Sequence, residues 1–327
     1  MPRKASNTLL QKAKKAKSDE FYTLLPDIER ELRYYESQFR DKVVYCNCDD
    51  PQTSNFYRYF ALNFEKLGLR KLIAACYRDG ERDLFSSVDI VSGYYYEYNG
   101  LAEDKMFPSD DDFIYFKGNG DFRSAESVEL LKKADIIVTN PPFSLFREFV
   151  SQLIRYEKKF LIIGNINAIT YKEIFNLIKE DKVWLGCNMG RGISGFIVPN
   201  YYDLYGTETE IDGNGCKIIS PNNCLWLTNL ETPLRREEIV LRKTYFGNET
   251  DYPHYDNCDG INVNKTQDIP YDYAGFIGVP ITFLHKFNPD QFEIIKFRKG
   301  DDGKDLSING VCPYFRILIK NKKVIER

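Results

Sequence analysis

Hydrophobic positions in the first 186 residues fall into short continuous runs separated by longer stretches with helical spacing. The short runs predict buried strands at residues 42–46, 70–77, 135–139, 158–165 and 182–186. In the intervening stretches apolar residues recur every three or four positions, which predicts helices, with Gly68 as a stop and Ser124 as an N-cap. Repeated strand and helix units indicate an α/β fold with a doubly wound, mainly parallel sheet that helices cover on both faces.

The pattern changes after residue 186. Gly, Asn, Pro and Tyr become frequent, and apolar runs such as 224–230 and 278–284 are no longer followed by long helices. A β- and loop-rich region of this kind commonly provides recognition loops on a rigid scaffold. We therefore predict three parts, which are a basic flexible arm at 1–18, an α/β domain at 19–186 and a β- and loop-rich region at 187–327.

Composition limits the chemistry that the chain can perform. It has 327 residues, 43% of them hydrophobic, which allows a sizeable core. The N-terminus lacks the apolar region of a signal peptide and no apolar run approaches the roughly 20 residues of a membrane span, so a cytoplasmic location is expected. The chain has 2 histidines and 8 scattered cysteines, which favours neither a metal centre nor a histidine-based catalytic triad.

Charge is distributed unevenly. The net charge of −3 argues against a nucleic-acid partner, because phosphate contacts come mainly from Lys and Arg. The segment before Asp19, however, has no acidic residue and has basic residues at Arg3, Lys4, Lys12, Lys14, Lys15 and Lys17. A basic arm is more often a solvated tail than a nucleic-acid contact, so charge alone does not decide the matter.

The segment TNPPF at 139–143 is chemically the most informative. It follows the strand predicted at 135–139, and ligands of open α/β sheets bind outside the carboxyl ends of the strands. Proline has no N–H group, so the turn presents acceptors without competing donors. These acceptors are the side chain of Asn140 and the carbonyl of Pro141, and Phe143 adds an aromatic ring.

Two acceptors beside an aromatic ring suit methyl transfer to an exocyclic amino group such as adenine N6. The lone pair of that nitrogen is delocalised into its ring, and acceptors that hold its two N–H bonds favour the tetrahedral, nucleophilic geometry. A methyl donor such as S-adenosylmethionine requires mainly in-line positioning, without metal or histidine. The alternative is a sharp strand-to-helix turn without a catalytic role, in which Ser144 is an N-cap.

The segment TNPPFSLFREF resembles motif IV of the amino-group methyltransferases, and nearly the whole chain resembles the EcoRI-type DNA adenine methyltransferase family. Further similar stretches are KAKKAKSDEFYT, VVYCNCDDP, GDFRSAES, GRGISGFIVP, ISPNNCLWLTNL and GVPITFLHKFNP. The resemblance implies a site-specific DNA adenine-N6 methyltransferase of a type II restriction-modification system that uses S-adenosylmethionine. It implies an S-adenosylmethionine-binding catalytic domain at 19–186 and a target-recognition region at 187–327, and it suggests GAATTC as the site.

Motifs X and I of the family imply contacts to the cofactor. DEFYT at 19–23 looks like motif X, which makes Phe21 and Thr23 its matching residues. CDDPQTSNF at 48–56 stands in the place of motif I, where Asp49 or Asp50 is expected to reach the cofactor. This turn departs from the family pattern, because serine and asparagine replace the usual glycines.

Motifs III and IV of the family complete the implied site. GNGDF at 118–122 resembles motif III, in which Asp121 bonds the cofactor adenine and Phe122 lines its pocket. The catalytic residues implied by motif IV are Asn140, Pro141, Pro142 and Phe143, and Asn140 is also expected to contact the cofactor.

Double-stranded DNA is the partner that the resemblance implies, and a target base must leave its stack to reach such a pocket. The basic arm is expected to order along the duplex, and Arg191 between glycines is a candidate for close approach to DNA. The expected DNA-binding residues are Lys12, Lys14, Lys15 and Arg191. We expect a monomer, with no protein partner implied.

Two other classes of function remain open at the level of sequence. Enzymes that methylate an RNA base or a protein glutamine amide also use an Asn-Pro-Pro-aromatic turn, because their targets are planar nitrogens as well. A DNA-binding protein on a catalytically inactive methyltransferase fold is the second alternative. The intact DEFYT, GDF and NPPF segments argue against this second alternative.

Overall fold

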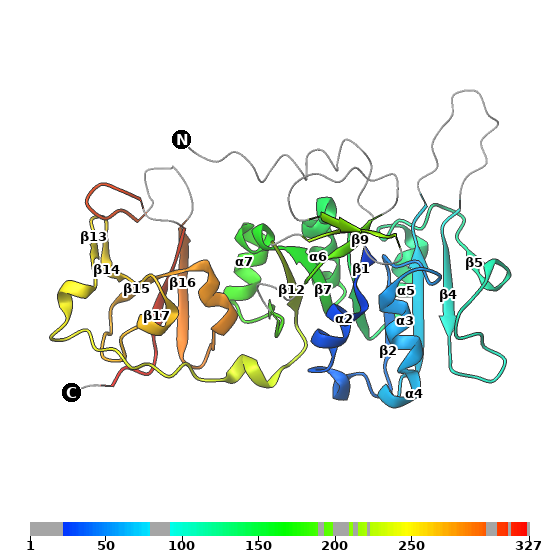
Figure 1. The fold of residues 1–327 in the computed structure, drawn as a ribbon, viewed down its shortest axis with the longest axis horizontal. Coiled ribbons are helices and arrows are strands. Elements are labelled where there is room, and N and C mark those ends of the chain that lie inside the picture. The colour runs from blue at the N-terminus through cyan, green and yellow to red at the C-terminus, as the bar shows by residue number, and fades with distance from the viewer. Residues whose placement is uncertain are drawn as a thin grey trace, which may run out of the picture. The chain divides into compact units, whose positions relative to one another are not determined.

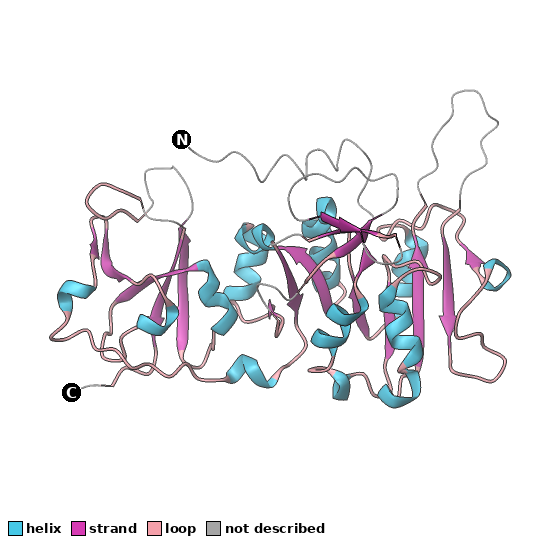
Figure 2. Cartoon of the chain, viewed as in Figure 1, coloured by secondary structure: helices cyan, strands magenta, loops and turns pink. Residues whose placement is uncertain are grey.

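The chain forms two compact units in a computed structural model (Figures 1 and 2). The first comprises Met1–Ile169 and Asn188–Leu230, and the second comprises Thr170–Cys187 and Glu231–Arg327. The boundaries between these compact units lie at 169/170, 187/188 and 230/231. They do not test the functional division at 186/187, which stays a prediction. The structure describes residues 22–78, 92–188, 193–198, 209–211, 215–220, 223–298, 306–312 and 315–325.

The first unit contains both α-helices and strands. They are β1 (Tyr22–Thr23), α2 (Leu25–Leu32), β2 (Val43–Cys46), α3 (Asn55–Leu62), α4 (Phe64–Leu67), β3 (Lys71–Cys76), β4 (Tyr94–Tyr98), β5 (Ile114–Tyr115), α5 (Ala125–Lys133), β6 (Ile136–Thr139), α6 (Phe146–Arg155), β7 (Lys159–Asn165), β9 (Phe196–Val198), β10 (Thr209–Ile211), β11 (Lys217–Ile219) and β12 (Cys224–Thr228). The 3-10 helices of both units are η1 (Glu36–Gln38), η2 (Asp110–Asp112), η3 (Phe143–Leu145), η4 (Ile166–Thr170), η5 (Pro233–Arg236), η6 (Glu249–Asp251), η7 (Thr266–Asp268) and η8 (Ile281–Lys286).

The main sheet of the first unit is mixed, which corrects the prediction of a doubly wound, mainly parallel sheet. Its strands lie in the order β5-β4-β3-β2-β6-β7-β12. The central strands β3, β2, β6 and β7 are parallel, whereas β4, β5 and β12 run antiparallel to their neighbours. An apolar run predicts a buried strand but contains no signal for the direction of that strand. The antiparallel direction of the flanking strands could therefore not be predicted.

The parallel centre contains a topological switch point. The chain passes from β2 through α3 to β3 in one direction along the sheet, and from β6 through α6 to β7 in the other. Right-handed crossovers in opposite directions place α3 and α6 on opposite faces. Because β2 and β6 are neighbours, their carboxyl ends open toward the crevice where such sheets bind ligands.

Local signals explain the helix that follows β2. Ser54 is the N-cap of α3, and its side chain accepts a hydrogen bond from the Phe56 amide at 3.1 Å. The predicted single helix is interrupted at Asn63, whose side-chain amide donates to the Tyr59 carbonyl at 2.8 Å. The continuation α4 ends at Gly68 with φ +63°, which confirms the predicted stop, because this left-handed conformation favours glycine.

A second, antiparallel sheet in the first unit has the order β1-β9-β11-β10. In this sheet Tyr22 faces Ile197 and Thr23 faces Phe196. The sheet therefore places Tyr22 and Thr23 of the DEFYT segment beside residues that lie more than 170 positions later in the sequence.

The second unit contains its own five-stranded sheet with the order β13-β14-β15-β17-β16. Only β14 and β15 are a parallel pair. Helix α7 packs on β16, with the rings of Phe175 and Phe297 5.2 Å apart and Lys179 Nζ donating to the Ile295 carbonyl at 2.7 Å. The α-helix and strands of the second unit are α7 (Lys172–Lys179), β8 (Trp184–Leu185), β13 (His254–Tyr255), β14 (Cys258–Asn262), β15 (Phe276–Pro280), β16 (Phe292–Arg298) and β17 (Arg316–Asn321).

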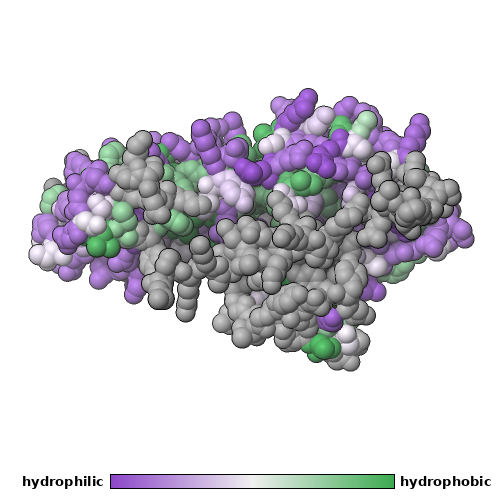
Figure 3. Space-filling model, turned by 90° about the horizontal axis from the view of Figure 1, so that it is seen from above, coloured by the Kyte–Doolittle hydropathy of each residue, from purple (hydrophilic) through white to green (hydrophobic). Residues whose placement is uncertain are grey.

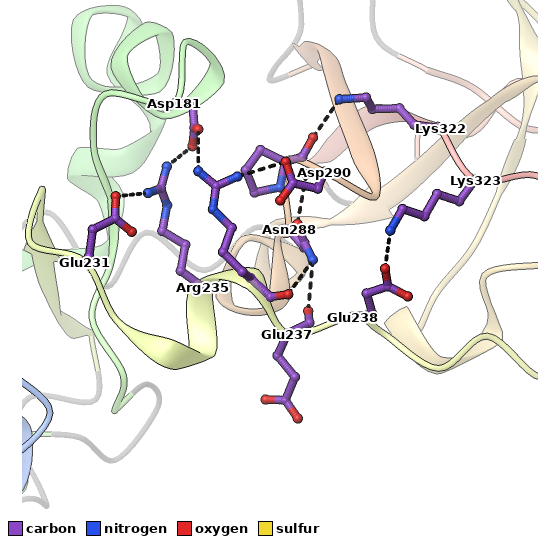
Figure 4. Close-up of polar contacts among 11 residues, drawn as sticks. Asp181, Glu231, Arg235, Glu237, Glu238, Asn288, Asp290, Lys322 and Lys323 are labelled. Carbon is purple, nitrogen blue, oxygen red and sulfur yellow. Dashed lines mark hydrogen bonds and ion pairs between the residues drawn. The ribbon is translucent and has the colours of Figure 1, made fainter.

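Polar contacts converge on Arg235 in the second unit (Figure 4). Its side chain is 4% exposed, lies over the Trp184 ring with 3.3 Å to the centroid, and donates to the carboxylates of Asp181 and Glu231. The neighbouring Arg236 is half exposed and donates to Asp290 at 3.0 Å. A buried guanidinium thus joins the loop after α7 to the segment that begins at Glu231.

Most described residues visible on the face in Figure 3 are hydrophilic, and hydrophobic residues form separate patches among them. Within the described ranges, none of the helices has the length and apolar character that crossing a membrane would require.

Candidate active site

The NPPF turn follows directly on β6. Pro141 is buried, and Asn140 and Phe143 are half-buried. The carbonyl of Pro142 accepts a hydrogen bond from the Leu145 amide at 3.0 Å, so the chain enters η3 before α6 begins. Ser144 is exposed and lies within η3, and the N-caps of η3 and α6 are Pro142 and Leu145, so the expectation that Ser144 caps a helix is wrong.

Asp49, in the turn after β2, is hydrogen-bonded to the NPPF turn. Its side chain accepts hydrogen bonds from the Thr139 hydroxyl, from Ser54 Oγ at 2.7 Å and from the backbone amide of Asn140. Thr139 Oγ1 in turn accepts a hydrogen bond from the Cys48 amide at 3.2 Å. The turns at the carboxyl ends of β2 and β6 are therefore joined by side-chain hydrogen bonds.

Burial controls the acidity of Asp49. The residue is 8% exposed, and desolvation raises the pKa of its carboxyl to about 6, although hydrogen bonds from Thr139, Ser54 and the Asn140 amide act in the opposite direction. Asp50 is half-buried and accepts hydrogen bonds from the Tyr94 hydroxyl and the Gln52 amide, both at 2.9 Å. Of the two predicted cofactor-binding acids, Asp50 is thus the less enclosed.

Thr23 of β1 lies close to both turns. Its carbonyl accepts a hydrogen bond from Asn55 Nδ2 at 2.8 Å, at the start of α3. Its strand partner Phe196 meets the ring of Phe143 edge-on, with centroids 6.3 Å apart. Thr23, the last residue of the segment predicted as motif X, therefore lies close to the segments predicted as motifs I and IV.

Two buried polar atoms near these turns suit a polar ligand. Thr23 Oγ1 and Asn47 Oδ1 are buried and have no hydrogen-bond partner among the described residues. An unsatisfied buried polar atom costs about 1–3 kcal/mol, which a bound ligand can offset. Because Thr23 was predicted to bind the cofactor and Asn47 follows β2 at its carboxyl end, the residues fit a cofactor with several polar groups.

The GNGDF turn lies beside the carboxyl end of β3. Gly120 has φ +79°, and a Cβ there would lie 2.7 Å from the Cys76 carbonyl, so only glycine fits. The Arg78 amide also donates to the Asn119 carbonyl at 2.9 Å. The turn therefore sits at the same edge of the sheet as the turns after β2 and β6.

The side chains of this turn have partners within the protein. The Arg123 guanidinium donates to Asp121 at 2.6 Å and holds the pKa of that carboxyl below its ordinary value. Phe122 is 5% exposed and packs edge-on against Phe149 at 5.1 Å. Ser124 is the N-cap of α5, as predicted, and accepts from the Ser127 amide at 3.2 Å.

Some predicted site residues lie outside the described part of the chain, namely Lys12, Lys14, Lys15, Phe21 and Arg191. In the part that is described, no group of three or more His, Cys, Asp or Glu side chains is arranged to hold a metal ion.

Sequence reasoning assigned no role to Thr139, Ser54, Asn55 or Phe196, which the structure places at the centre of this cluster. The sequence distinguishes Ser54 and Asn55 only as the residues that stand where motif I of the family usually has glycines. The sole available signal for Phe196 was its position in the GRGISGFIVP stretch, which resembles the family but names no contact.

The chain is similar in sequence to known adenine-specific and type II methyltransferases. The profile of the family described as "Adenine-specific methyltransferase EcoRI" matches residues 9–322. The type II methyltransferase M.EcoRI of Escherichia coli is 65% identical over 324 residues, which cover 99% of each chain. The type II methyltransferases M.MgeORF184P of Mycoplasma genitalium and M.MpnI of Mycoplasma pneumoniae are 37% and 36% identical, over 96% and 95% of this chain and 98% of each relative. No solved structure gives a significant match.

A profile match that spans almost the whole chain and high identity over its full length exclude a chance likeness of short motifs. The chain belongs to the family of the adenine-specific methyltransferase EcoRI and is an adenine-specific type II methyltransferase.

Proposed function

We propose that the enzyme transfers the methyl group of S-adenosylmethionine to adenine N6 in double-stranded DNA at the site GAATTC, as the modifying half of a restriction-modification pair. The observation that carries the proposal is the joining of the turns after β2 and β6 at the switch point of the sheet. Methyl transfer requires donor and acceptor to be held in line within a short distance, and two fixed neighbouring turns meet this requirement.

The cofactor would be held by β1, the turn after β2 and the GNGDF turn beside the carboxyl end of β3. Thr23 Oγ1 and Asn47 Oδ1 offer buried polar atoms, and Asp50 offers a less enclosed carboxylate. The family resemblance also assigns Phe21, Asp121, Phe122 and Asn140 to this role. For the turn after β2 it assigns Asp49 or Asp50, and we propose that Asp50 is the one that contacts the cofactor. S-adenosylmethionine supplies an electrophilic methyl group on a sulfonium whose positive charge is lost when the methyl leaves.

The NPPF turn would hold the target adenine. The side-chain oxygen of Asn140 and the carbonyl of Pro141 accept the two N6 hydrogens, which keeps the nitrogen lone pair directed at the methyl group. Pro142 fixes the turn with φ −60°, and Phe143 stacks on the face of the base. The N6–methyl bond forms as the sulfur–methyl bond breaks, and the surplus N6 proton passes to solvent.

The target base must be extruded from the duplex, which costs a few kcal/mol and has to be offset by contacts to the DNA. We assign these contacts to Lys12, Lys14, Lys15 and Arg191, and target recognition to the region 187–327. A monomer suffices, because each strand of the site can be methylated in a separate event.

The test is methyl transfer from radiolabelled S-adenosylmethionine to short duplexes, one with GAATTC and others with single base changes, beside RNA and protein substrates. Label at adenine N6 of the GAATTC duplex alone is expected. Label on another duplex would refute the site while retaining the chemistry, and label only on RNA or on a glutamine side chain would refute the DNA substrate. Asn140→Ala is expected to abolish transfer while binding of cofactor and duplex persists.

A further inference from the structure

The NPPF turn has very few backbone groups with which to hold its own position. Pro141 and Pro142 have no N–H, so Asn140 provides the only backbone donor between Thr139 and Phe143. That donor is bonded to the Asp49 side chain, 91 positions earlier in the sequence. The position of Asn140 therefore depends on a residue of the turn after β2.

Thr139 strengthens the same connection. It is the last residue of β6, is fully buried, donates its hydroxyl proton to Asp49 Oδ2 and accepts a hydrogen bond from the Cys48 amide. One hydroxyl thus bonds to two consecutive residues of the opposite turn. Ser54 Oγ holds the other carboxylate oxygen of Asp49 and links it to the N-terminus of α3.

We propose that Asp49 and Thr139 are positioning residues that fix the NPPF turn against the cofactor-binding turn, and thereby set the in-line geometry of methyl transfer. The inference rests on the proposed function of the NPPF turn. Neither residue need touch the reacting atoms, because both act through the backbone of Asn140. A small displacement of one turn relative to the other lowers the rate of transfer while each ligand can still bind.

A direct contact between Asp49 and the cofactor is the competing interpretation. It is disfavoured because Asp49 is 8% exposed and because its Oδ1 and Oδ2 accept from Ser54 and Thr139, respectively. The adjacent Asp50 is half-buried and lies in the same turn. Direct binding and positioning differ in a measurable way, since only the former lowers cofactor affinity in proportion to the rate.

The decisive variant is Thr139→Val, which keeps the shape of the side chain and removes its hydroxyl. Thr228 is a matched control, because it too ends a strand, is fully buried, donates to the Phe160 carbonyl at 2.6 Å and accepts from the Leu230 amide at 3.0 Å. Thr139→Ser retains the hydroxyl and serves as the conservative variant.

For Thr139→Val we expect kcat to fall roughly 10- to 100-fold while the Kd values for S-adenosylmethionine and for the GAATTC duplex change less than about threefold. Thr139→Ser should restore most of the rate, and Thr228→Val should keep it. Asp49→Asn should reduce kcat as well, and the double variant should lose less than the product of the two single losses, because the two residues act as one unit.

Hydrogen exchange of the Asn140 amide provides a readout that does not depend on activity. We expect faster exchange in Thr139→Val and Asp49→Asn than in the wild type, with no change in Thr228→Val. The inference is overturned if Thr139→Val keeps its kcat, if Thr228→Val loses as much, or if cofactor affinity falls in step with the rate. Absence of any methyl transfer by the wild type would refute the proposed function instead, and the exchange comparison would still decide whether Asp49 and Thr139 hold the turn.

Discussion

The ring of Phe143 meets the ring of Phe196 edge-on, with centroids 6.3 Å apart and planes inclined by 71°. Phe196 is the strand partner of Thr23, so the aromatic residue of the NPPF turn is braced by the small sheet that contains β1. Edge-on aromatic pairs contribute about 0.5–1.5 kcal/mol beyond their buried area. The contact therefore restricts the orientation of the ring that is proposed to stack on the target adenine.

Replacing Phe143 by alanine is expected to weaken capture of the extruded base. Stacking of one base on an aromatic side chain is worth about 1–3 kcal/mol, so kcat/KM for the duplex should fall roughly 5- to 150-fold. A duplex with 2-aminopurine at the target position should show less fluorescence change on binding. Phe143→Tyr keeps the ring and should remain near the wild type, and equal activity of Phe143→Ala and Phe143→Tyr would rule out stacking.

The hydrogen bond from Asn55 to the Thr23 carbonyl predicts a selective effect on cofactor binding. Asn55→Ala should leave β1 less firmly attached to the turn after β2 and raise the Kd for S-adenosylmethionine roughly 3- to 10-fold, as expected for loss of one hydrogen bond. Isothermal titration calorimetry would measure this Kd. Asn63→Ala is the matched control, because Asn63 makes a 2.8 Å bond to a backbone carbonyl at the other end of α3. Similar Kd changes in both variants would exclude a specific role for Asn55.

The sequence predicted features of this site whose signals are local. A continuous apolar run identified the strand before Asn140, and Ser124 and Gly68 were recognised as helix boundaries from capping preferences that depend on a few neighbouring residues. The chemistry of the NPPF turn stays a prediction, and it could be argued from the sequence because acceptors and missing N–H groups are properties of the residues themselves.

Contacts between distant segments had no comparable signal. Thr139 and Asp49 are 90 positions apart, and Phe143 meets Phe196 only because β9 pairs with β1. Such contacts follow from the order of strands in the sheets, which hydrophobic periodicity does not encode. For the same reason the antiparallel direction of β4, β5 and β12 was not predicted, although the apolar run that contains β12 was identified.

The raised pKa of Asp49 predicts an unusual pH dependence of stability. The folded-state pKa of about 6 lies above the ordinary value of 3.8, so its contribution to stability is fully present below about pH 4 and is lost as pH rises through about 6. At pH 7 the loss is roughly 3 kcal/mol. Urea unfolding from about pH 4 to pH 7 should therefore show a smaller decline in Asp49→Asn than in the wild type. If the free energy of unfolding declines equally with pH in the two proteins, ionisation of Asp49 is not the cause of the decline.

Asp112 provides a control with the opposite sign. Hydrogen bonds from Lys105 and Ser109 lower the pKa of its carboxyl to about 2. Its contribution is present above the ordinary value of 3.8 and is lost as pH falls toward about 2. Asp112→Asn should consequently differ from the wild type by a constant amount above about pH 5, and the difference should shrink only in acid.

The contacts of Arg235 predict that its side chain stabilises the second unit. Its 4% exposed guanidinium lies 3.3 Å from the centre of the Trp184 ring and pairs with Asp181 and Glu231, which are themselves 34% and 62% exposed. Since water can still reach the two carboxylates, Arg235→Ala is expected to lower the free energy of unfolding by roughly 2–4 kcal/mol, less than a fully buried pair would. Arg235→Lys keeps the charge but not the planar fork and should fall between alanine and the wild type.

Tryptophan fluorescence can follow the unfolding of the second unit separately. The chain has 2 tryptophans, of which Trp184 lies in the second unit and Trp226 in the first. In a Trp226→Phe background, urea unfolding followed at Trp184 should shift to lower denaturant when Arg235 is replaced. Arg236→Ala is the matched control, since Arg236 is 44% exposed and its pairs with Asp290 and, at 3.5 Å, with Asp181 should together contribute less than about 1 kcal/mol. If both variants lose the same stability, the stacked and buried position of Arg235 adds nothing beyond a surface ion pair.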